Sequence, residues 1–359
     1  MVFFSVQHSL ATRLKALLAV AAIATAAAAV AAQIAQPPRV RFALPEEGTW
    51  WRAPQLLAAK WGIFEDESVV VEEKYWPTGK RALQGLVQDE GDIAFVATPP
   101  IMKAAERGEK LLILAQAMSS PRLVHLLTRK ENIDDWYAHP IGLARNTILE
   151  LYLIEHLKRI GKLDAYRNNQ LNLIDRSAIE SNVFSLVEND VNTIVVFEPF
   201  STLATAAHAN APSFVDISLP VYTVACYIVT TPEHWSKNRT AILRTMAAIR
   251  RADNEMARHP QRAWQEVKPL LVYGAQLSDK EWNDVDFSLV TDKTVIRANI
   301  EKDITLGSSA GFYKTSPDID ELLSVLDEVN VGLETKEFRR LDILRRLSLR
   351  DWTAGKNSN

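Results

Sequence analysis

The sequence predicts an α/β fold of two lobes, each a mainly parallel sheet flanked by helices. From residue 38 onward, short apolar runs alternate with segments of helical pattern, which is typical of parallel strands covered on both faces. The alternation restarts near residue 141, so the chain contains two units of similar size. Beyond residue 232 the pattern is almost wholly helical, and no strands are left for a third sheet.

The first unit contains four apolar runs, three of them followed by a helical segment. Pro54 and Pro99 each begin a helix, where a residue without an amide hydrogen is tolerated. The expected strands are residues 39–44, 69–75, 92–97 and 111–117, and the expected helices are residues 54–61, 80–88 and 99–107.

The second unit repeats this order and is inserted into the first. Its expected strands are residues 141–144, 171–174, 193–197 and 214–217, with helices at 147–160, 179–189 and 201–208. The late helices should cover the first unit, at residues 239–257, 261–271, 295–306 and 319–329. We therefore expect lobe 1 to comprise residues 38–122 and 231–359, lobe 2 residues 129–220, and the crossovers residues 123–128 and 221–230.

The first 32 residues have the order of a secretory signal. Arg13 and Lys15 precede an Ala/Leu-rich run, and small residues before Gln33 suit signal peptidase. The alternative is an uncleaved membrane anchor, but the run is short and mostly alanine. These residues predict an exported, periplasmic protein.

Composition excludes several classes of function. The chain of 359 residues has a formal net charge of −3, so it lacks the basic excess of nucleic-acid-binding proteins. Its one cysteine, Cys226, allows no intramolecular disulfide, and we expect it to be buried. No nucleophile elbow or phosphate loop occurs, and the histidines are scattered without metal-binding spacing. We expect no catalytic residue, no metal and no cofactor.

Polar turns follow four of the expected strands. In an open parallel sheet, ligands bind outside the carboxyl ends of the strands, where helix N-termini point inward. In GDIAFVATPPIM, residues 91–102, a buried strand ends at Thr98, placed as a helix cap before Pro99. The other turns contain Trp50 and Trp51, Thr78 and Gly79, and Arg145, Asn146 and Thr147. We expect these turns to meet at one cleft, with Thr98, Thr78, Asn146 and Thr147 as caps; a capped helix without a ligand is the alternative at each.

The order of several short motifs adds a family resemblance. A helix ends in Gly and an aromatic residue, Gly-Asp-Ile precedes a Pro-containing turn, and Glu-Pro-aromatic follows a strand. These motifs lie in LLAAKWGIFEDESVVVEEKYWPTGKRALQGLVQDEGDIAFVATPPIMKAAERG, IGLARNTILELYLIEHLKRIGKL and NTIVVFEPFSTLA. From residue 39 to about residue 271 the chain resembles solute-binding proteins of ABC importers for nitrate, sulfonates, taurine and thiamine-pyrimidine precursors.

The resemblance implies a type II periplasmic binding fold that closes on its ligand by hinge motion. It implies capture of a small sulfonate, another oxyanion or a nitrogenous heteroaromatic compound, and delivery to an ABC permease in the inner membrane by a monomer. Two rival functions stay open: a sensory or adaptor domain, which the basic segment 338–352 fits, and an enzyme acting on a small heterocycle. The yeast-type pyrimidine synthases of this fold have a cysteine-rich stretch that this chain lacks, which weakens the enzymatic alternative.

Several candidate ligand-binding residues have a structural alternative. Trp50 and Trp51 offer indole faces, but one of such a pair commonly packs under its own loop. Arg145 could hold an anion or lie exposed at a helix start; its turn lacks the glycine usual in the family, which predicts a bulkier, more cationic pocket. Glu198 is better suited to anchoring the hinge than to binding a ligand amine. Tyr222 could touch ligand or only pack.

Overall fold

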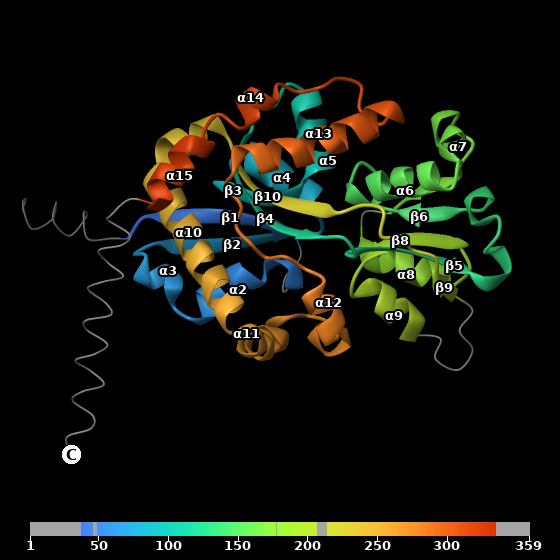
Figure 1. Cartoon of the computed structure of the whole chain (residues 1–359), viewed down its shortest axis with the longest axis horizontal. Coiled ribbons are helices and arrows are strands. Elements are labelled where there is room, and N and C mark those ends of the chain that lie inside the picture. Colours follow the sequence, from blue (N-terminus) through green and yellow to red (C-terminus); the bar gives the residue numbers. More distant parts are fainter. Residues whose placement is uncertain (1–36, 46–48, 177, 207–213, 335–359) are drawn as a thin grey trace, which may run out of the picture. The chain divides into compact units, whose positions relative to one another are not determined.

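The computed structural model describes residues 37–45, 49–176, 178–206 and 214–334. The chain divides into the units Met1–Arg39 and Val40–Asn359, and apart from Arg39 the two five-stranded sheets belong to the second unit (Figure 1). Helices flank both sheets, so the predicted two-lobed α/β class is confirmed.

The first sheet has the strand order β2-β1-β3-β10-β4. Strand β1 pairs in parallel with β3, whereas β10 is antiparallel to both β3 and β4. Its strands are β1 (Arg39–Pro45), β2 (Val70–Trp76), β3 (Ile93–Ala97), β4 (Leu112–Ser120) and β10 (Val224–Thr230). All seven residues of β10 are buried, because this strand lies inside the sheet and helices cover it.

The second sheet has the strand order β7-β6-β8-β5-β9. Strand β6 is parallel to β7 and β8, and β5 is antiparallel to β8 and β9. Its strands are β5 (Val124–Arg129), β6 (Ile141–Leu143), β7 (Leu173–Asp175), β8 (Thr193–Phe197) and β9 (Phe214–Asp216).

The chain passes between the sheets at residues 121–123 and 217–223. This corrects the expectation that residues 123–128 and 221–230 form the crossovers. Both of those apolar runs pair with strands on either side, as β5 in the second sheet and β10 in the first. Their unbroken apolar character reflects burial within a sheet, which an exposed connection does not need.

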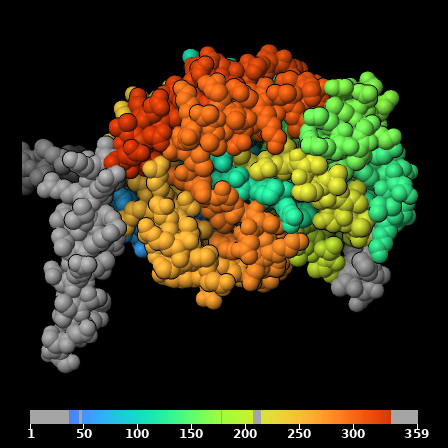
Figure 2. Space-filling view, viewed as in Figure 1, coloured from blue at the N-terminus to red at the C-terminus, as the bar shows by residue number. Residues whose placement is uncertain are grey.

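The late helices lie mainly along the first sheet. Helix α10 (Pro232–Arg258) packs on α2 (Ala53–Lys60) and α3 (Ile63–Asp66), α11 (Pro260–Val267) packs on α2, and α15 (Leu326–Glu334) contacts β4. Helix α13 (Lys293–Ser309) contacts α5 (Thr98–Glu106) and also reaches α6 (Ile148–Arg159) beside the second sheet. Figure 2 shows these late segments in orange and red over one face of the first lobe.

The helices have the following bounds. Beside the first sheet lie α2 (Ala53–Lys60), α3 (Ile63–Asp66), α4 (Gly79–Val87), α5 (Thr98–Glu106), α10 (Pro232–Arg258), α11 (Pro260–Val267), α12 (Asp279–Asn283), α13 (Lys293–Ser309), α14 (Ile319–Leu322) and α15 (Leu326–Glu334). Beside the second lie α6 (Ile148–Arg159), α7 (Leu163–Arg167), α8 (Ile179–Val187) and α9 (Phe200–Ala206). Short 3-10 helices are η1 (Trp50–Arg52), η2 (Lys130–Asn132), η3 (Trp136–Ala138), η4 (Lys268–Leu270) and η5 (Gly274–Gln276).

Two predicted segments, the signal at residues 1–32 and the basic segment 338–352, lie outside the described residues. Within the described ranges, no helix is both long enough and apolar enough to cross a membrane.

Candidate functional site

Four helices begin around a small cavity between the two sheets, which we call the inner cavity. It has a volume of about 70 Å³ and is lined from both lobes. The first lobe contributes the start of α4 and the end of β3, and the second contributes the starts of α6 and α8. Pro100, in the first turn of α5, completes this part of the lining. The inner cavity therefore lies at strand ends and helix starts.

Two of the predicted helix caps lie in the wall of the inner cavity. The hydroxyl of Thr78 accepts a hydrogen bond from the Arg81 amide at 3.3 Å at the start of α4. The hydroxyl of Thr147 accepts from the Leu149 amide at 3.3 Å at the start of α6. Amides in a first helical turn lack intrahelical partners, so both helix starts favour negative charge.

Lys80 is the only charged residue in the lining of the inner cavity that the structure describes. Its ammonium group donates to the carbonyl oxygen of Arg145 at 3.1 Å, which joins the first turn of α4 to the loop before α6. Gly79 lines the cavity beside it. Lys80 was not among the predicted ligand-binding residues. Its position two residues after the helix cap Thr78 places it in the first turn of α4, which could have indicated a place at the site.

Apolar groups form the remaining walls of the inner cavity. The rings of Trp51 and Phe197 lie 5.3 Å apart between centroids and come from opposite lobes. Burial raises the pKa of the Cys226 thiol to about 12, so it stays neutral and contributes an apolar surface. The cavity combines polar helix starts with walls suited to a hydrocarbon or a ring.

A second cavity, which we call the outer groove, shares Trp51 with the first. It has a volume of about 390 Å³, and Glu180 is the only charged residue among the described residues that line it. The Trp50 indole donates to the carbonyl oxygen of Glu198 at 3.1 Å, which links the two lobes beside the groove. Six aromatic residues line the groove: Trp50, Trp51, Tyr75, Trp76, Phe200 and Tyr273.

The predicted role of Thr98 as a helix cap is wrong. Helix α5 starts at Thr98 itself, Ala97 takes the cap position, and no side-chain cap is formed. Pro99 and Pro100 have no amide hydrogens to donate, so few backbone amides could donate a hydrogen bond to a capping hydroxyl of Thr98. The Thr98 side chain is fully buried and lines neither cavity, and Pro99 is absent from the lining of both cavities.

Arg145 forms an ion pair with a buried carboxylate and lines neither cavity. Its guanidinium lies 2.8 Å from Glu150 Oε1, and Glu150 is 0% exposed. The same carboxylate accepts from the Asn146 amide at 2.7 Å and the Tyr166 hydroxyl at 2.9 Å. The expected cationic pocket at this turn is therefore not formed by Arg145.

Asn146 does not cap α6, because Thr147 takes that position. The Asn146 backbone has a positive φ of 58°, a conformation that asparagine tolerates better than most residues. This explains how the turn forms without the glycine that is usual in the family. Asn146 lines a separate surface cavity near Lys103.

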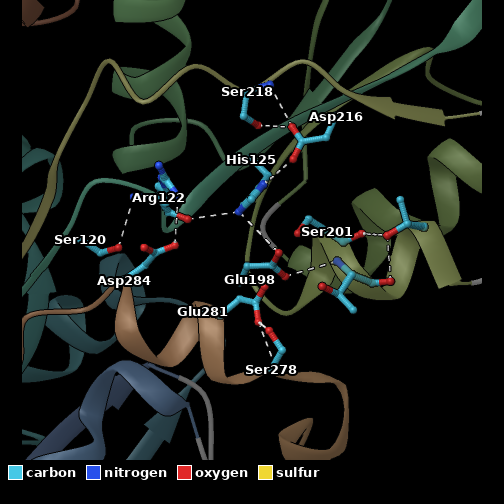
Figure 3. A network of polar contacts seen from close by, with 12 residues as sticks. Ser120, Arg122, His125, Glu198, Ser201, Asp216, Ser218, Ser278, Glu281 and Asp284 are labelled. Carbon is cyan, nitrogen blue, oxygen red and sulfur yellow. Dashed lines mark hydrogen bonds and ion pairs between the residues drawn. The ribbon is translucent and has the colours of Figure 1, made fainter.

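Glu198 and Tyr222 have structural partners and line neither cavity. Glu198 Oε2 accepts from the Thr202 amide at 3.3 Å in α9, and Oε1 lies 3.5 Å from His125 Nε2 (Figure 3). The Tyr222 hydroxyl donates to Asp303 of α13. The described residues contain no cluster of three or more side chains suited to a metal ion.

Comparisons with known proteins identify the family and the fold. Residues 52–263 match the family model described as NMT1/THI5 like. No curated protein matches the sequence.

The solved structures that share the fold at low sequence identity include the following three. The alkanesulfonate-binding protein SsuA from Xanthomonas axonopodis pv. citri, bound to MOPS, is 12% identical with a TM-score of 0.63, covering 81% of this chain and 98% of its own. The nitrate-binding protein NrtA from Synechocystis PCC 6803 is 12% identical with a TM-score of 0.64, covering 84% and 88%. The ligand-binding component of an ABC-type import system from Staphylococcus aureus, with zinc bound, is 13% identical with a TM-score of 0.64, covering 81% and 99%.

Proposed function

The chain belongs to the NMT1/THI5-like family, and from this premise we propose that it captures a small organic anion for an ABC importer. One observation carries the proposal: helix starts from both lobes and the Lys80 ammonium surround one cavity with apolar walls. The names of the structural neighbours, among them a sulfonate-binding and a nitrate-binding protein, support the same class of function.

The charge of the lining favours an anion over a cation. Lys80 and the starts of α4 and α6 supply positive charge, and no carboxylate belongs to the described lining of the inner cavity. A sulfonate or carboxylate head can accept from the amides at residues 79–80 and at Ile148. Arg145, in the turn before α6, is already paired with Glu150.

The walls favour a ligand with an organic body over a bare inorganic ion. Trp51 lies in both cavities, so a ligand whose head occupies the inner cavity can extend along this indole into the outer groove. The aromatic lining of the groove suits a ring, which gains stacking contacts and loses little hydration. An aryl or heteroaryl sulfonate or carboxylate fits both cavities best.

Capture proceeds by closure of the lobes about residues 121–123 and 217–223, which we propose as the hinge. The ligand contacts helix starts of both lobes, so it binds the closed arrangement more tightly than an open one. The closed protein then delivers its ligand to a permease in the inner membrane. It requires no metal, cofactor or second copy of the chain for this task.

The ligand class is tested by a thermal-shift screen with matched pairs of compounds. Because a ligand that binds only the folded state raises the melting temperature, aryl sulfonates and carboxylates should raise it more than their uncharged amides. Short alkyl anions should give smaller shifts, since they leave the outer groove unfilled. Larger shifts from the amides or from organic cations would contradict the proposal.

Export is tested separately. The signal-like segment 1–32 predicts that mass spectrometry of a periplasmic extract will find a chain beginning near Gln33. Recovery of the full-length chain from cytosol alone would contradict export. The class of ligand would still be decided by the thermal-shift screen.

A further inference from the structure

His125 lies where the two crossovers leave the second sheet. It is the second residue of β5, directly after the first crossover, and its ring faces Asp216 at the end of β9, where the second crossover begins (Figure 3). The Nδ1 atom lies 2.8 Å from Asp216 Oδ2, and the Nε2 atom lies 3.1 Å from the carbonyl oxygen of Arg122. The side chain is 18% exposed, so the ring is largely shielded from water.

Within the described part of the chain, every polar atom that contacts the ring is an acceptor. Besides the Asp216 carboxylate and the Arg122 carbonyl, Glu198 Oε1 lies 3.5 Å from Nε2. A neutral imidazole donates from only one nitrogen and would turn the lone pair of the other toward an oxygen atom. Only the imidazolium donates from both nitrogens, so this arrangement favours the protonated ring.

We propose that His125 is held as an imidazolium that ties the two crossovers together, making the rigidity of the hinge dependent on pH. The link itself stands on the contacts of His125 and needs no ligand, whereas the description of the two crossovers as a hinge rests on the proposed function. The link between the crossovers reaches the ligand site indirectly, through Glu198. This residue follows Phe197, which lines the inner cavity, and its carbonyl oxygen accepts a hydrogen bond from the Trp50 indole.

The charges around the ring favour the imidazolium. Burial lowers the pKa of His125, but the hydrogen bond to Asp216 and the charge of Glu198 outweigh burial and raise the pKa above its ordinary value. Burial likewise raises the pKa of Asp216, and the hydrogen bonds from His125 and Ser218 reverse this, so Asp216 stays ionised.

The titratable and charged side chains on neighbouring described elements do not neutralise the negative charge of Asp216 and Glu198. On α6, burial lowers the pKa of His156 to about 4 and raises that of Tyr152 to about 12, so both side chains facing Asp216 are neutral near pH 7. The Arg122 guanidinium is directed toward Asp284, at 3.8 Å, on the side of the first lobe (Figure 3). Among the described residues, His125 is the cationic partner of Asp216 and Glu198.

The sign of the pH dependence follows from the raised pKa. Because the folded protein binds this proton more tightly than the unfolded chain, the link stabilises the fold fully below the unfolded value of about 6.5. The stabilisation is lost as the pH rises through the folded pKa. Deprotonation leaves the buried Glu198 and the partly exposed Asp216 facing a neutral ring and loosens both crossovers.

Nuclear magnetic resonance of the histidine rings in the full chain tests the proposal without a ligand. The His125 signal, assigned by its loss in His125→Gln, should titrate above about 6.5 and show both ring nitrogens protonated at neutral pH. A titration at or below that value would overturn the proposal. If His125→Gln does not fold, backbone-based assignment of the wild-type signal gives the same decision.

Thermal melting from pH 6 to pH 9 provides a second readout. Glutamine retains a neutral hydrogen-bond donor but not the charge of the imidazolium. At pH 6 the melting temperature of wild type should therefore exceed that of His125→Gln. The difference between the two melting temperatures should narrow as the pH rises. The exposed His259 serves as the control, because His259→Gln should melt like wild type throughout. A gap between wild type and His125→Gln that does not change with pH would refute the pH-dependent link.

Discussion

Replacing Lys80 with methionine is expected to weaken the binding of an anionic ligand strongly. Methionine keeps the length and apolar stem of the side chain but removes the only charge in the described lining of the inner cavity. A hydrogen bond to a charged group contributes about 1.5–3 kcal/mol, so the dissociation constant should rise roughly tenfold to a hundredfold. Calorimetry with the best anionic compound from the screen measures this change.

A matched lysine separates the local effect from a general loss of charge. Lys74 is exposed on β2 and lines neither cavity, so Lys74→Met should bind the same compound like wild type. The uncharged amide of that compound should bind wild type and Lys80→Met about equally. Equal affinity of wild type and Lys80→Met for the anion would remove Lys80 from the ligand site.

Replacing Arg145 with alanine is expected to destabilise the fold and leave ligand affinity nearly unchanged. Without the guanidinium, the fully buried Glu150 keeps only the Asn146 amide and the Tyr166 hydroxyl. Removing one partner of a buried ion pair costs about 3–5 kcal/mol, and because Arg145 is 38% exposed we expect the low end, about 3 kcal/mol. Urea denaturation measures the loss of unfolding free energy.

Two further variants sharpen this test. The double variant Arg145→Ala with Glu150→Gln should recover part of the stability, since the buried charge is gone. Lys237→Ala, at an exposed ion pair with Glu233, should leave stability unchanged within error. If Arg145→Ala instead lost most ligand affinity at unchanged stability, Arg145 would be a ligand contact.

Features set by local sequence were predicted well. The alternation of apolar and helical segments anticipated both sheets, and Thr78 and Thr147 cap their helices because cap chemistry depends on the next three residues. The prediction failed for Thr98 for an equally local reason that was overlooked. The two prolines after it lack the amide hydrogens that a cap needs.

Features set by long-range contacts could not be predicted. The sequence does not reveal that Arg145 is paired with Glu150 five residues later, because both residues also suit solvent-exposed positions. The role of Lys80 depends on the Arg145 carbonyl of the other lobe, 65 positions away. The apolar runs at residues 123–128 and 221–230 were expected to be crossovers, because their own sequence does not indicate which strands they pair with. Strand pairing depends on the whole sheet.

A crystal structure of the complex with the most tightly binding anionic compound is the most direct test of where the ligand binds. We expect the anionic group at the starts of α4 and α6, within hydrogen-bond distance of the Lys80 ammonium, and the body of the ligand along Trp51 toward the outer groove. A head group bound in the outer groove or on the surface near Asn146, with no contact to α4 or α6, would contradict it.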